Sequence, residues 1–432
     1  MNIAIIGSGM AGLATARILK DAGHNITIFE ALPGRGMDSH SMEFDGGLID
    51  APLRVMNPHL WKNTLSLATH LGISTYPVRT YMACSWLFEE KTETWLTTTR
   101  SRIGNFPIIS NRKGLQQYGW RLVKGMLQLK VAIAKFFKSK NQDITLADFI
   151  NQNEIEEVFL HGAVMPVLYT ICTCNPKTIG EWPAKPLLIF LRQLTDGDAL
   201  LRLQGGTPAL VDKLIDGIEI ISDAPIIDVK ETEQGVLVKN NHQQSFIFDR
   251  VIVATPTTKV EEFLDKAQFS EDIELLKKFK FEDGDLVIHT DATVMPPKRK
   301  DWSVLSYMMD RQFTRQQFTV WLNSVEPSLV GKQPIFQTWR PVTEIDPKKI
   351  VASVKLTRAV VDSKTVALNK ELQLRHQQPD RKVFFCGSWS CDGLPILESA
   401  VTSAMNIAEI FNAPLPFVGL KPKVEVAPQL GY

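Results

Sequence analysis

The chain has 432 residues, with 48 Lys and Arg residues against 47 Asp and Glu residues. A length above about 250–300 residues predicts two closely joined domains. The balanced charge gives no support to nucleic-acid binding, and no run reaches the roughly 18 apolar residues that a membrane-spanning helix needs.

A glycine-rich turn near the start of the chain carries the clearest motif. Residues 2–6 form a short apolar run that predicts a buried parallel strand, and the pattern G-x-G-x-x-G follows at Gly7, Gly9 and Gly12. A helix is expected next, over residues 11–20. Gly7 permits the tight turn, Gly9 lets the backbone approach a pyrophosphate, and Gly12 lets the helix pack closely on the strand. The pattern therefore predicts a dinucleotide site.

Further groups suited to a dinucleotide surround this turn. Ser8, Met10 and Ala11 lie at the start of the helix, where free backbone N–H groups can bind phosphates. A second strand, expected over residues 26–29, ends at Glu30, whose carboxylate can accept hydrogen bonds from a ribose. Because an acid ends the second strand, the pattern is much more specific than a lone glycine motif.

The position of the motif and the spacing of the cysteines bear on the compartment and on metal binding. The motif begins at residue 2, which leaves no room for a cleaved signal peptide before it, so we expect a cytoplasmic protein. The five cysteines are too scattered for a disulfide framework and have no companion ligands at metal spacing. We interpret them as reduced thiols that serve mostly in packing, and we predict no metal site; they are Cys84, Cys172, Cys174, Cys386 and Cys391.

The segment after Glu30 is rich in glycine and lacks a clear helix. Gly34, Gly36, Gly46 and Gly47 mark a loop and a hairpin, before a helical spacing returns at residues 58–71. An NAD dehydrogenase more commonly goes straight from the acid into another β-α unit. This passage therefore favours a longer cofactor that lies across the sheet.

A basic helix with an apolar face is predicted within residues 112–140. Its apolar residues alternate with lysines, among them Lys124, Lys130 and Lys135. One interpretation is a helix that packs on the core and leaves its lysines in solvent. The other is an interfacial helix, near residues 120–138, that rests on anionic lipid and guides a lipid-like substrate inward.

The rest of the chain predicts a helical insertion followed by many short strands. Residues 86–200 are expected to be largely helical. Strands are expected at residues 218–221, 226–230, 235–239, 245–249, 251–256, 285–290, 303–309, 318–323, 335–339 and 383–386. A helix of small residues follows at 397–411. The segment 414–432 is punctuated by proline, and we expect it to lie over the surface or to be disordered.

Four landmarks occur in an order that carries a family resemblance. They are GSGMAG with Glu30, the strand at 224–229, the strand ending Ala254-Thr255-Pro256, and FFCGSW followed by ESAVTSAMNIA. With them the chain resembles the monoamine-oxidase and phytoene-desaturase superfamily of FAD-dependent oxidoreductases. Residues 287–296 with Trp302, and residues 145–149, are most similar to bacterial predicted NAD/FAD-binding flavoproteins associated with cyclopropane fatty acid synthases.

The resemblance implies an α/β fold of the GR2 flavoprotein type. A Rossmann-like FAD-binding domain is expected at residues 1–85, 200–270 and 380–413. A substrate domain of mixed β-sheet plus helices is expected at 86–199 and 271–379, with 414–432 as a tail. The implied activity is oxidation or desaturation of a C–C or C–N bond in a small, apolar substrate, by hydride transfer to flavin N5. The alternatives are an NAD-dependent Rossmann dehydrogenase and a non-catalytic flavin-binding protein.

The expected FAD contacts follow from the motif and the resemblance. The sequence identifies no catalytic side chain, and we expect His289 to be an ordinary strand residue. Trp389 either lines the flavin or packs in the core. Two departures from the family stand out: Arg35 precedes Gly36-Met37-Asp38 where a Gly-Gly-Arg triplet is usual, and Gly387-Ser388 replaces Gly-Asp or Gly-Glu. The predicted cofactor-binding residues are Gly7, Ser8, Gly9, Met10, Ala11, Gly12, Glu30, Ala31, Arg54, Ile226, Gly387, Ser388 and Ala400.

Overall fold

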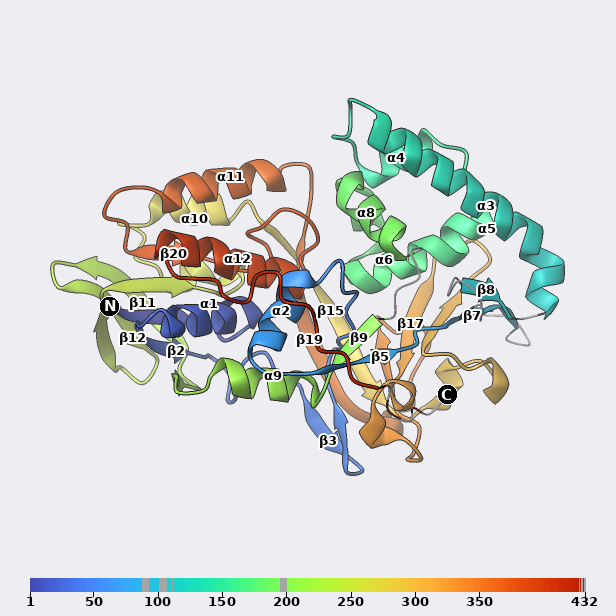
Figure 1. Ribbon diagram of the computed structural model, residues 1–432, viewed down its shortest axis with the longest axis horizontal. Coiled ribbons are helices and arrows are strands. Elements are labelled where there is room, and N and C mark those ends of the chain that lie inside the picture. Colours follow the sequence, from blue (N-terminus) through green and yellow to red (C-terminus); the bar gives the residue numbers. More distant parts are fainter. Residues whose placement is uncertain are drawn as a thin grey trace.

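The molecule has two lobes, each built around one large sheet (Figure 1). The computed structural model describes residues 1–87, 93–100, 107–110, 112–194, 200–426, 428 and 430. One lobe contains a five-stranded parallel sheet and the other an eight-stranded mixed sheet. The fold class is α/β, as the sequence predicted.

The parallel sheet has the strand order β10-β2-β1-β14-β20, with every neighbouring pair parallel. Its middle strands are short apolar runs that are buried almost throughout, which is typical of a parallel sheet covered on both faces. The strands are β1 (Asn2–Ile6), β2 (Asn25–Phe29), β10 (Glu219–Ile221), β14 (Arg250–Val253) and β20 (Val383–Phe385).

Helices and a small antiparallel sheet complete this lobe. The helices α1 (Met10–Asp21) and α12 (Leu397–Ile410) pack against each other beside the parallel sheet. The small sheet contains β11 (Ile226–Thr232), β12 (Gly235–Asn240) and β13 (Ser245–Phe248). The other helices of the lobe are α2 (Lys62–His70), α9 (Gly206–Leu214), α10 (Ser270–Leu276) and α11 (Thr365–His376).

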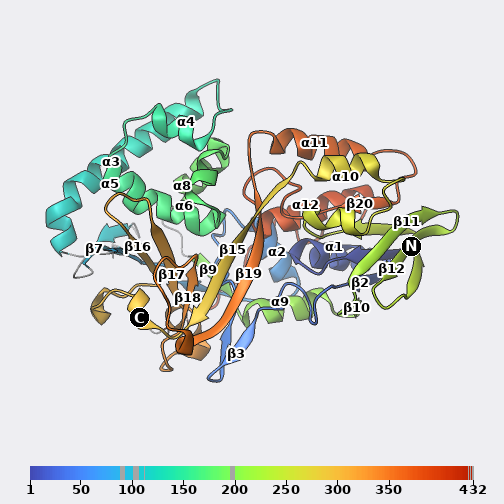
Figure 2. The ribbon, with the colours of Figure 1, turned by 180° about the vertical axis from the view of Figure 1, so that it is seen from behind.

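The eight-stranded sheet has the order β19-β15-β18-β17-β16-β6-β7-β8. Only β16 and β6 pair in parallel among its described strands. The long pair β15 and β19 lies at the junction of the two lobes in both views (Figure 2). The strands are β6 (Met82–Trp86), β7 (Thr94–Arg100), β8 (Pro107–Ile109), β15 (Lys280–His289), β16 (Leu305–Met309), β17 (Gln316–Trp321), β18 (Phe336–Trp339) and β19 (Ile350–Val360).

A layer of helices covers one side of this lobe, and α3 lies at its outer margin (Figure 1). Thr145 caps the start of helix α4 through reciprocal hydrogen bonds with Asp148. Among the described residues, no helix combines the length and the apolar character needed to cross a bilayer. The helices are α3 (Arg112–Lys138), α4 (Leu146–Asn151), α5 (Glu157–Phe159), a π-helix (Leu160–Val164), α6 (Met165–Cys172), α7 (Pro176–Gly180) and α8 (Ala184–Leu194).

Smaller elements connect the lobes. The strands β3 (Met42–Phe44) and β4 (Gly47–Ile49) form a hairpin, whereas β5 (Thr75–Val78) pairs antiparallel with the distant strand β9 (Leu200–Leu203). The tail runs beside β5, because the Thr75 N–H donates to the Lys423 carbonyl at 2.8 Å. Short 3₁₀ helices occur at Thr257–Glu262, Ala292–Val294, Arg299–Asp301, Leu322–Ser324, Pro327–Leu329 and Pro347–Lys349.

Several expectations need correction at this level. Residues 86–200 are largely helical, as expected, but they also contain β7 and β8, which extend the mixed sheet through antiparallel pairing. The strand β19 and the helix α11 were not predicted at all. The side chains of α10 and α11 share one apolar core with the parallel sheet, although all of α11 and all but the first residue of α10 fall within the predicted substrate domain. Likewise β6, most of which falls within the predicted FAD domain, pairs in the mixed sheet.

Candidate functional site

The glycine turn lies at the carboxyl end of β1 and leads directly into α1. A Cβ at Gly12 would lie 2.0 Å from the Gly7 carbonyl oxygen, so the helix could not approach the strand with any other residue there. Gly9 is different, because its φ of −68° is ordinary and no protein atom lies within 4 Å of a Cβ at that position. Neither backbone nor packing requires glycine at residue 9. The space beside it fits a group that approaches the backbone from outside the chain.

Glu30 is held against this turn by three hydrogen bonds. Its carboxylate accepts the Ser8 N–H at 3.0 Å, the Ser8 hydroxyl, and the Leu32 N–H at 2.9 Å. The Met37 N–H also donates to the Ser8 carbonyl at 3.0 Å, so the glycine-rich passage packs on the turn. Ala31 is exposed at the surface directly after Glu30. The acid therefore lies beside the turn, as the motif predicted.

A cavity of about 380 Å³ lies in front of the glycine turn, between the two lobes. Its walls come from the turn, from the segment after β4, from the end of α6, from β16 to β19, and from the start of α12. Of the predicted residues, those that line the cavity are Gly9, Met10, Ala11, Arg54, Gly387, Ser388 and Ala400, together with Trp389.

Other predicted residues do not line this cavity. Gly7 and Gly12 shape the turn behind it, and Ser8 and Glu30 bind each other beside it. Ile226 pairs with Asn240 at the start of β11 and packs in the apolar core next to the parallel sheet. The cavity thus gathers the turn, Arg54 and the segment after β20 from three distant parts of the sequence.

The two arginines considered from sequence have different partners. The Arg54 guanidinium donates to Thr207 Oγ1 at 2.8 Å and to the Met37 carbonyl at 3.4 Å, and burial lowers its pKa. Arg35 instead forms ion pairs with Asp38 and Asp212. Arg35 is therefore engaged by two carboxylates, whereas Arg54 is the one that reaches the cavity.

Trp389 belongs both to the core and to the cavity wall. Its Nε1–H donates to the Thr255 carbonyl at 3.3 Å, and its ring meets that of Phe279 edge-on, with 4.8 Å between centroids. A Cβ at Gly387 would lie 2.2 Å from this Nε1, so glycine allows the indole to fold back. The Gly387 N–H donates to Ser403 Oγ of α12 at 3.1 Å. Trp389 therefore packs in the core and also lines the cavity in front of the glycine turn.

Sequence reasoning missed several residues of the cavity. Thr255 lines it, and its Oγ1 is buried without a hydrogen-bond partner among the described residues. Arg358, on the unpredicted strand β19, also lines it, as do Thr170 and Thr173 near the end of α6. The Ala-Thr-Pro landmark could have pointed to Thr255. The alternation Val354, Leu356, Arg358 could have pointed to a cation on an apolar strand face.

A buried ionic cluster lies next to Arg54. Arg202 is 1% exposed and binds the Glu326 carboxylate through two nitrogens, at 2.6 and 3.1 Å, and that of Asp50 at 3.1 Å. Burial would lower the pKa of Arg202, but Asp50, Tyr76 and Glu326 together raise it. Asp50 also accepts the Thr207 N–H at the start of α9. The cluster ties the segment after β4 to β9 and to the mixed sheet.

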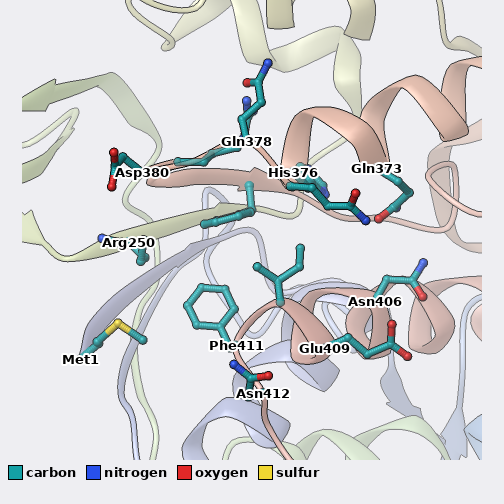
Figure 3. Close-up of a pocket in the computed structure, with 14 residues that line it drawn as sticks. Met1, Arg250, Gln373, His376, Gln378, Asp380, Asn406, Glu409, Phe411 and Asn412 are labelled. Carbon is teal, nitrogen blue, oxygen red and sulfur yellow. The ribbon is translucent and has the colours of Figure 1, made fainter.

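A larger groove of about 830 Å³ lies at the other end of the parallel sheet (Figure 3). Met1 and Arg250, at the amino ends of β1 and β14, line it together with His376. His376 Nε2 accepts the Phe385 N–H at 3.1 Å, and burial, followed by the charge of Arg381, lowers its pKa to about 3. Its imidazole is therefore a neutral structural acceptor. Open α/β sheets bind ligands at the carboxyl ends of their strands, which favours the cavity over this groove.

The comparison with known families decides the assignment of the glycine turn. Residues 10–288 match the pattern of the family described as "Flavin containing amine oxidoreductase". The chain belongs to this family. FAD is accordingly its cofactor, as predicted. The open space at Gly9, the absence of a side-chain cap on α1 and the unpartnered Thr255 hydroxyl all fit a bound flavin dinucleotide in the cavity.

Individual amine oxidoreductase relatives are distant. A 4,4'-diapophytoene desaturase of Staphylococcus aureus is 37% identical over 68 residues, which cover 16% of this chain and 14% of that one. The flavin-dependent L-tryptophan oxidase RebO of Lentzea aerocolonigenes is 23% identical over 266 residues, 56% of this chain and 55% of that one. The chain thus aligns with 14% of the desaturase and 55% of the tryptophan oxidase, less than two thirds of either relative.

Solved structures show the same fold at low identity. An oxidoreductase from Methanosarcina mazei has a TM-score of 0.66 at 12% identity, and the match covers 95% of this chain and 100% of that one. A redesigned putrescine oxidase has a TM-score of 0.66 at 15% identity, with 95% and 99% covered. The two-lobed arrangement is therefore the fold of amine-oxidase-type flavoproteins.

Proposed function

We propose that the chain is an FAD-dependent oxidase or desaturase that oxidises a C–C or C–N bond of a small, apolar substrate. The observation that carries this proposal is the cavity, which joins the glycine turn to apolar side chains of the mixed sheet. Leu305, Phe318 and Val320 supply part of that apolar wall. The resemblance of residues 287–296 to flavoproteins associated with cyclopropane fatty acid synthases also favours an apolar substrate.

The residues of the turn have distinct roles in this proposal. The backbone N–H groups of Met10 and Ala11 bind the pyrophosphate, and the Glu30 carboxylate binds the ribose of the adenosine half. When bound, FAD supplies N5 of its ring as the acceptor for a hydride from the substrate. The apolar walls exclude water from the bond being oxidised, and Trp389 at the cavity edge helps to position the ring.

Anaerobic reduction by substrate tests the proposal. The purified protein is expected to be yellow, and its flavin absorbance is expected to bleach when a substrate is added without oxygen. Oxygen or another acceptor then restores the absorbance. Primary amines, amino acids and unsaturated lipids of matched length form a suitable panel. A colourless protein whose melting temperature FAD does not raise would contradict the proposal, because an oxidase of this kind must retain its cofactor.

We further propose that α3 contacts an anionic membrane surface. Its Leu122, Leu129 and Phe136 are buried against the lobe, which accounts for one apolar face. A second apolar stripe points outward, with Trp120 75% exposed and Leu127 and Val131 each 53% exposed. Spacings of seven and eleven residues are close to two and three full turns, so these three side chains lie on one line. Packing on the core accounts for the buried stripe alone, and a membrane contact would account for the exposed one.

The charge of α3 supports the same proposal. The helix contains seven Lys and Arg residues and no acid, although the whole chain has a net charge of only +1. By helical position, Lys124 and Lys135 flank the outward stripe on one side and Lys130 flanks it on the other. Lysines beside an apolar stripe suit an interfacial helix, and each contributes about 1 kcal/mol near an anionic surface.

Flotation with liposomes tests the membrane contact. The wild-type protein is expected to float with phosphatidylglycerol vesicles at low salt, and to bind less as salt rises. Converting Lys124, Lys130 and Lys135 to glutamate is expected to abolish binding. The matched control carries the same charge change at the exposed Lys364, Lys370 and Lys421, which lie outside α3. Equal losses in both triple variants, or no flotation of the wild type, would contradict the contact.

A further inference from the structure

Arg358, which lines the cavity, has no partner of opposite charge among the residues that the structure describes. Arg358 lies on β19, on the same strand face as Val354 and Leu356, which pack in the core of the mixed sheet. No hydrogen bond or ion pair joins its guanidinium to the described residues. Burial lowers its pKa, and the nearby groups that oppose this shift are the thiols of Cys172 and Cys174. Arg358 is a cation on an apolar wall.

The acid that could have paired with Arg358 is already engaged. Glu282 lies directly opposite Arg358 on β15. Its carboxylate binds the Arg340 guanidinium at 2.5 Å and accepts the Asn175 N–H at 2.9 Å. Arg340 and Arg358 would therefore compete for the Glu282 carboxylate, and in the structure Glu282 pairs with Arg340.

The neighbouring buried charges do not neutralise Arg358 either. Arg54 and Arg202 carry two positive charges, and Asp50 and Glu326 carry two negative charges, so this cluster is neutral by itself. Arg358 adds one uncompensated positive charge to the cavity wall. Arg358 is partly buried, and removing a charge from water without a partner is costly. The cost is removed when a ligand brings a negative charge to the same place.

We propose that Arg358 binds a carboxylate group of the substrate, which is therefore a carboxylic acid with an apolar body. This inference rests on the proposed oxidase or desaturase function of the same cavity. Arginine suits the task because its planar guanidinium forms two parallel hydrogen bonds to a carboxylate. The apolar side chains Leu305, Phe318 and Val320 line the cavity for the rest of the molecule.

The position of Arg358 favours the substrate over the phosphates of FAD. Arg358 belongs to the mixed sheet and neighbours Cys172, the last residue of α6. The glycine turn, by contrast, belongs to the parallel sheet of the other lobe. A guanidinium that served the pyrophosphate would be needed for FAD binding itself, and that difference can be measured.

Binding of three eight-carbon probes to the FAD-loaded protein tests the proposal. The probes are octanoate, octan-1-ol and octylamine, used below their micelle concentrations and followed by calorimetry and by changes in the flavin spectrum. The wild type is expected to bind octanoate most tightly. Arg358→Gln is expected to weaken octanoate at least about tenfold, the usual effect of losing a charged hydrogen-bond partner. Its affinity for octanol and for FAD should not change.

Two further variants control for folding. Lys355→Gln removes a positive charge from the opposite face of the same strand, where Lys355 is exposed and pairs with Asp283 at 3.3 Å, so it should leave octanoate binding intact. Arg358→Lys keeps the charge without the planar fork and should retain part of the binding. If Arg358→Gln fails to fold, weaker octanoate binding by Arg358→Lys than by the wild type still supports the proposal, and equal binding overturns it.

The remaining outcomes separate this proposal from the function on which it rests. Equal octanoate affinity in wild type and Arg358→Gln overturns the carboxylate site, as does a wild type that does not bind octanoate. A parallel loss of FAD affinity in Arg358→Gln assigns the guanidinium to the cofactor and also overturns it. A wild type that retains no flavin contradicts the proposed function instead, and calorimetry with octanoate then still reports on Arg358.

Discussion

Gly9→Val is expected to abolish FAD retention and to leave the folded chain intact. A Cβ at residue 9 meets no atom of the other described residues within 4 Å, and the φ of −68° is accessible to valine, so we expect the apoprotein to stay folded. The same side chain would occupy the space in which the pyrophosphate approaches the backbone. We therefore expect a colourless protein with the melting temperature of the wild-type apoprotein.

Two other glycines make this prediction specific. Gly12→Val should prevent folding, because its Cβ would lie 2.0 Å from the Gly7 carbonyl oxygen. Gly284→Val should keep the flavin, because residue 284 lies in β15 and its Cβ would make only ordinary contacts, at 3.5 Å or more. Flavin absorbance after gel filtration and thermal unfolding of the apoproteins measure both effects. Retention of FAD by Gly9→Val would show that the turn does not hold the pyrophosphate.

Arg202→Met is expected to lower the free energy of unfolding by about 3–5 kcal/mol, the usual cost of leaving a buried charge without its partner. The substitution strands the carboxylates of Asp50 and Glu326, which both lie within 3.1 Å of Arg202. Urea unfolding of the FAD-free protein measures the loss.

An exposed ion pair provides the control for Arg202. Lys259→Met breaks a pair with Glu262 in which both side chains are more than half exposed, and it should cost less than about 1 kcal/mol. Adding Glu326→Gln to Arg202→Met should restore part of the stability, since one stranded charge is then removed. If Arg202→Met costs no more than Lys259→Met, the cluster contributes little to stability.

Local signals accounted for the elements nearest the glycine turn. The strand at residues 2–6 was predicted with the limits of β1, because a short apolar run between a polar start and a glycine allows few alternatives. The helix α1 extends one residue beyond the prediction at each end, and the strand β2 begins one residue earlier than predicted. Glu30 lies beside the turn because β1 and β2 pair in register, which follows from the β-α-β pattern itself.

Long-range contacts explain what the sequence could not supply. The strand β19 alternates apolar residues with Ser353, Lys355 and Thr357, but Arg358 interrupts the pattern, and the long pairing with β15 extends the strand past it. Arg358 therefore reached the cavity from a segment for which no element had been predicted. Thr173 lies at the end of α6, and only tertiary packing brings that end to the cavity. The motifs predicted the wall of the cavity at the glycine turn, whereas strand pairing and tertiary packing determine the wall that contains Arg358 and Thr173.

The strand order of the parallel sheet has a consequence for how the chain is made. β1 precedes the other strands of this sheet in the sequence, and it pairs with β2 on one side and with β14, which ends at Val253, on the other. β14 in turn pairs with β20, which ends at Phe385. During translation the edge of β1 therefore stays unpaired until the ribosome has passed residue 253, and the sheet closes only after residue 385. Such non-local pairing is slow and leaves strand edges open to other chains. An amino-terminal fragment that stops before β14 would carry the whole glycine motif and still aggregate without binding FAD.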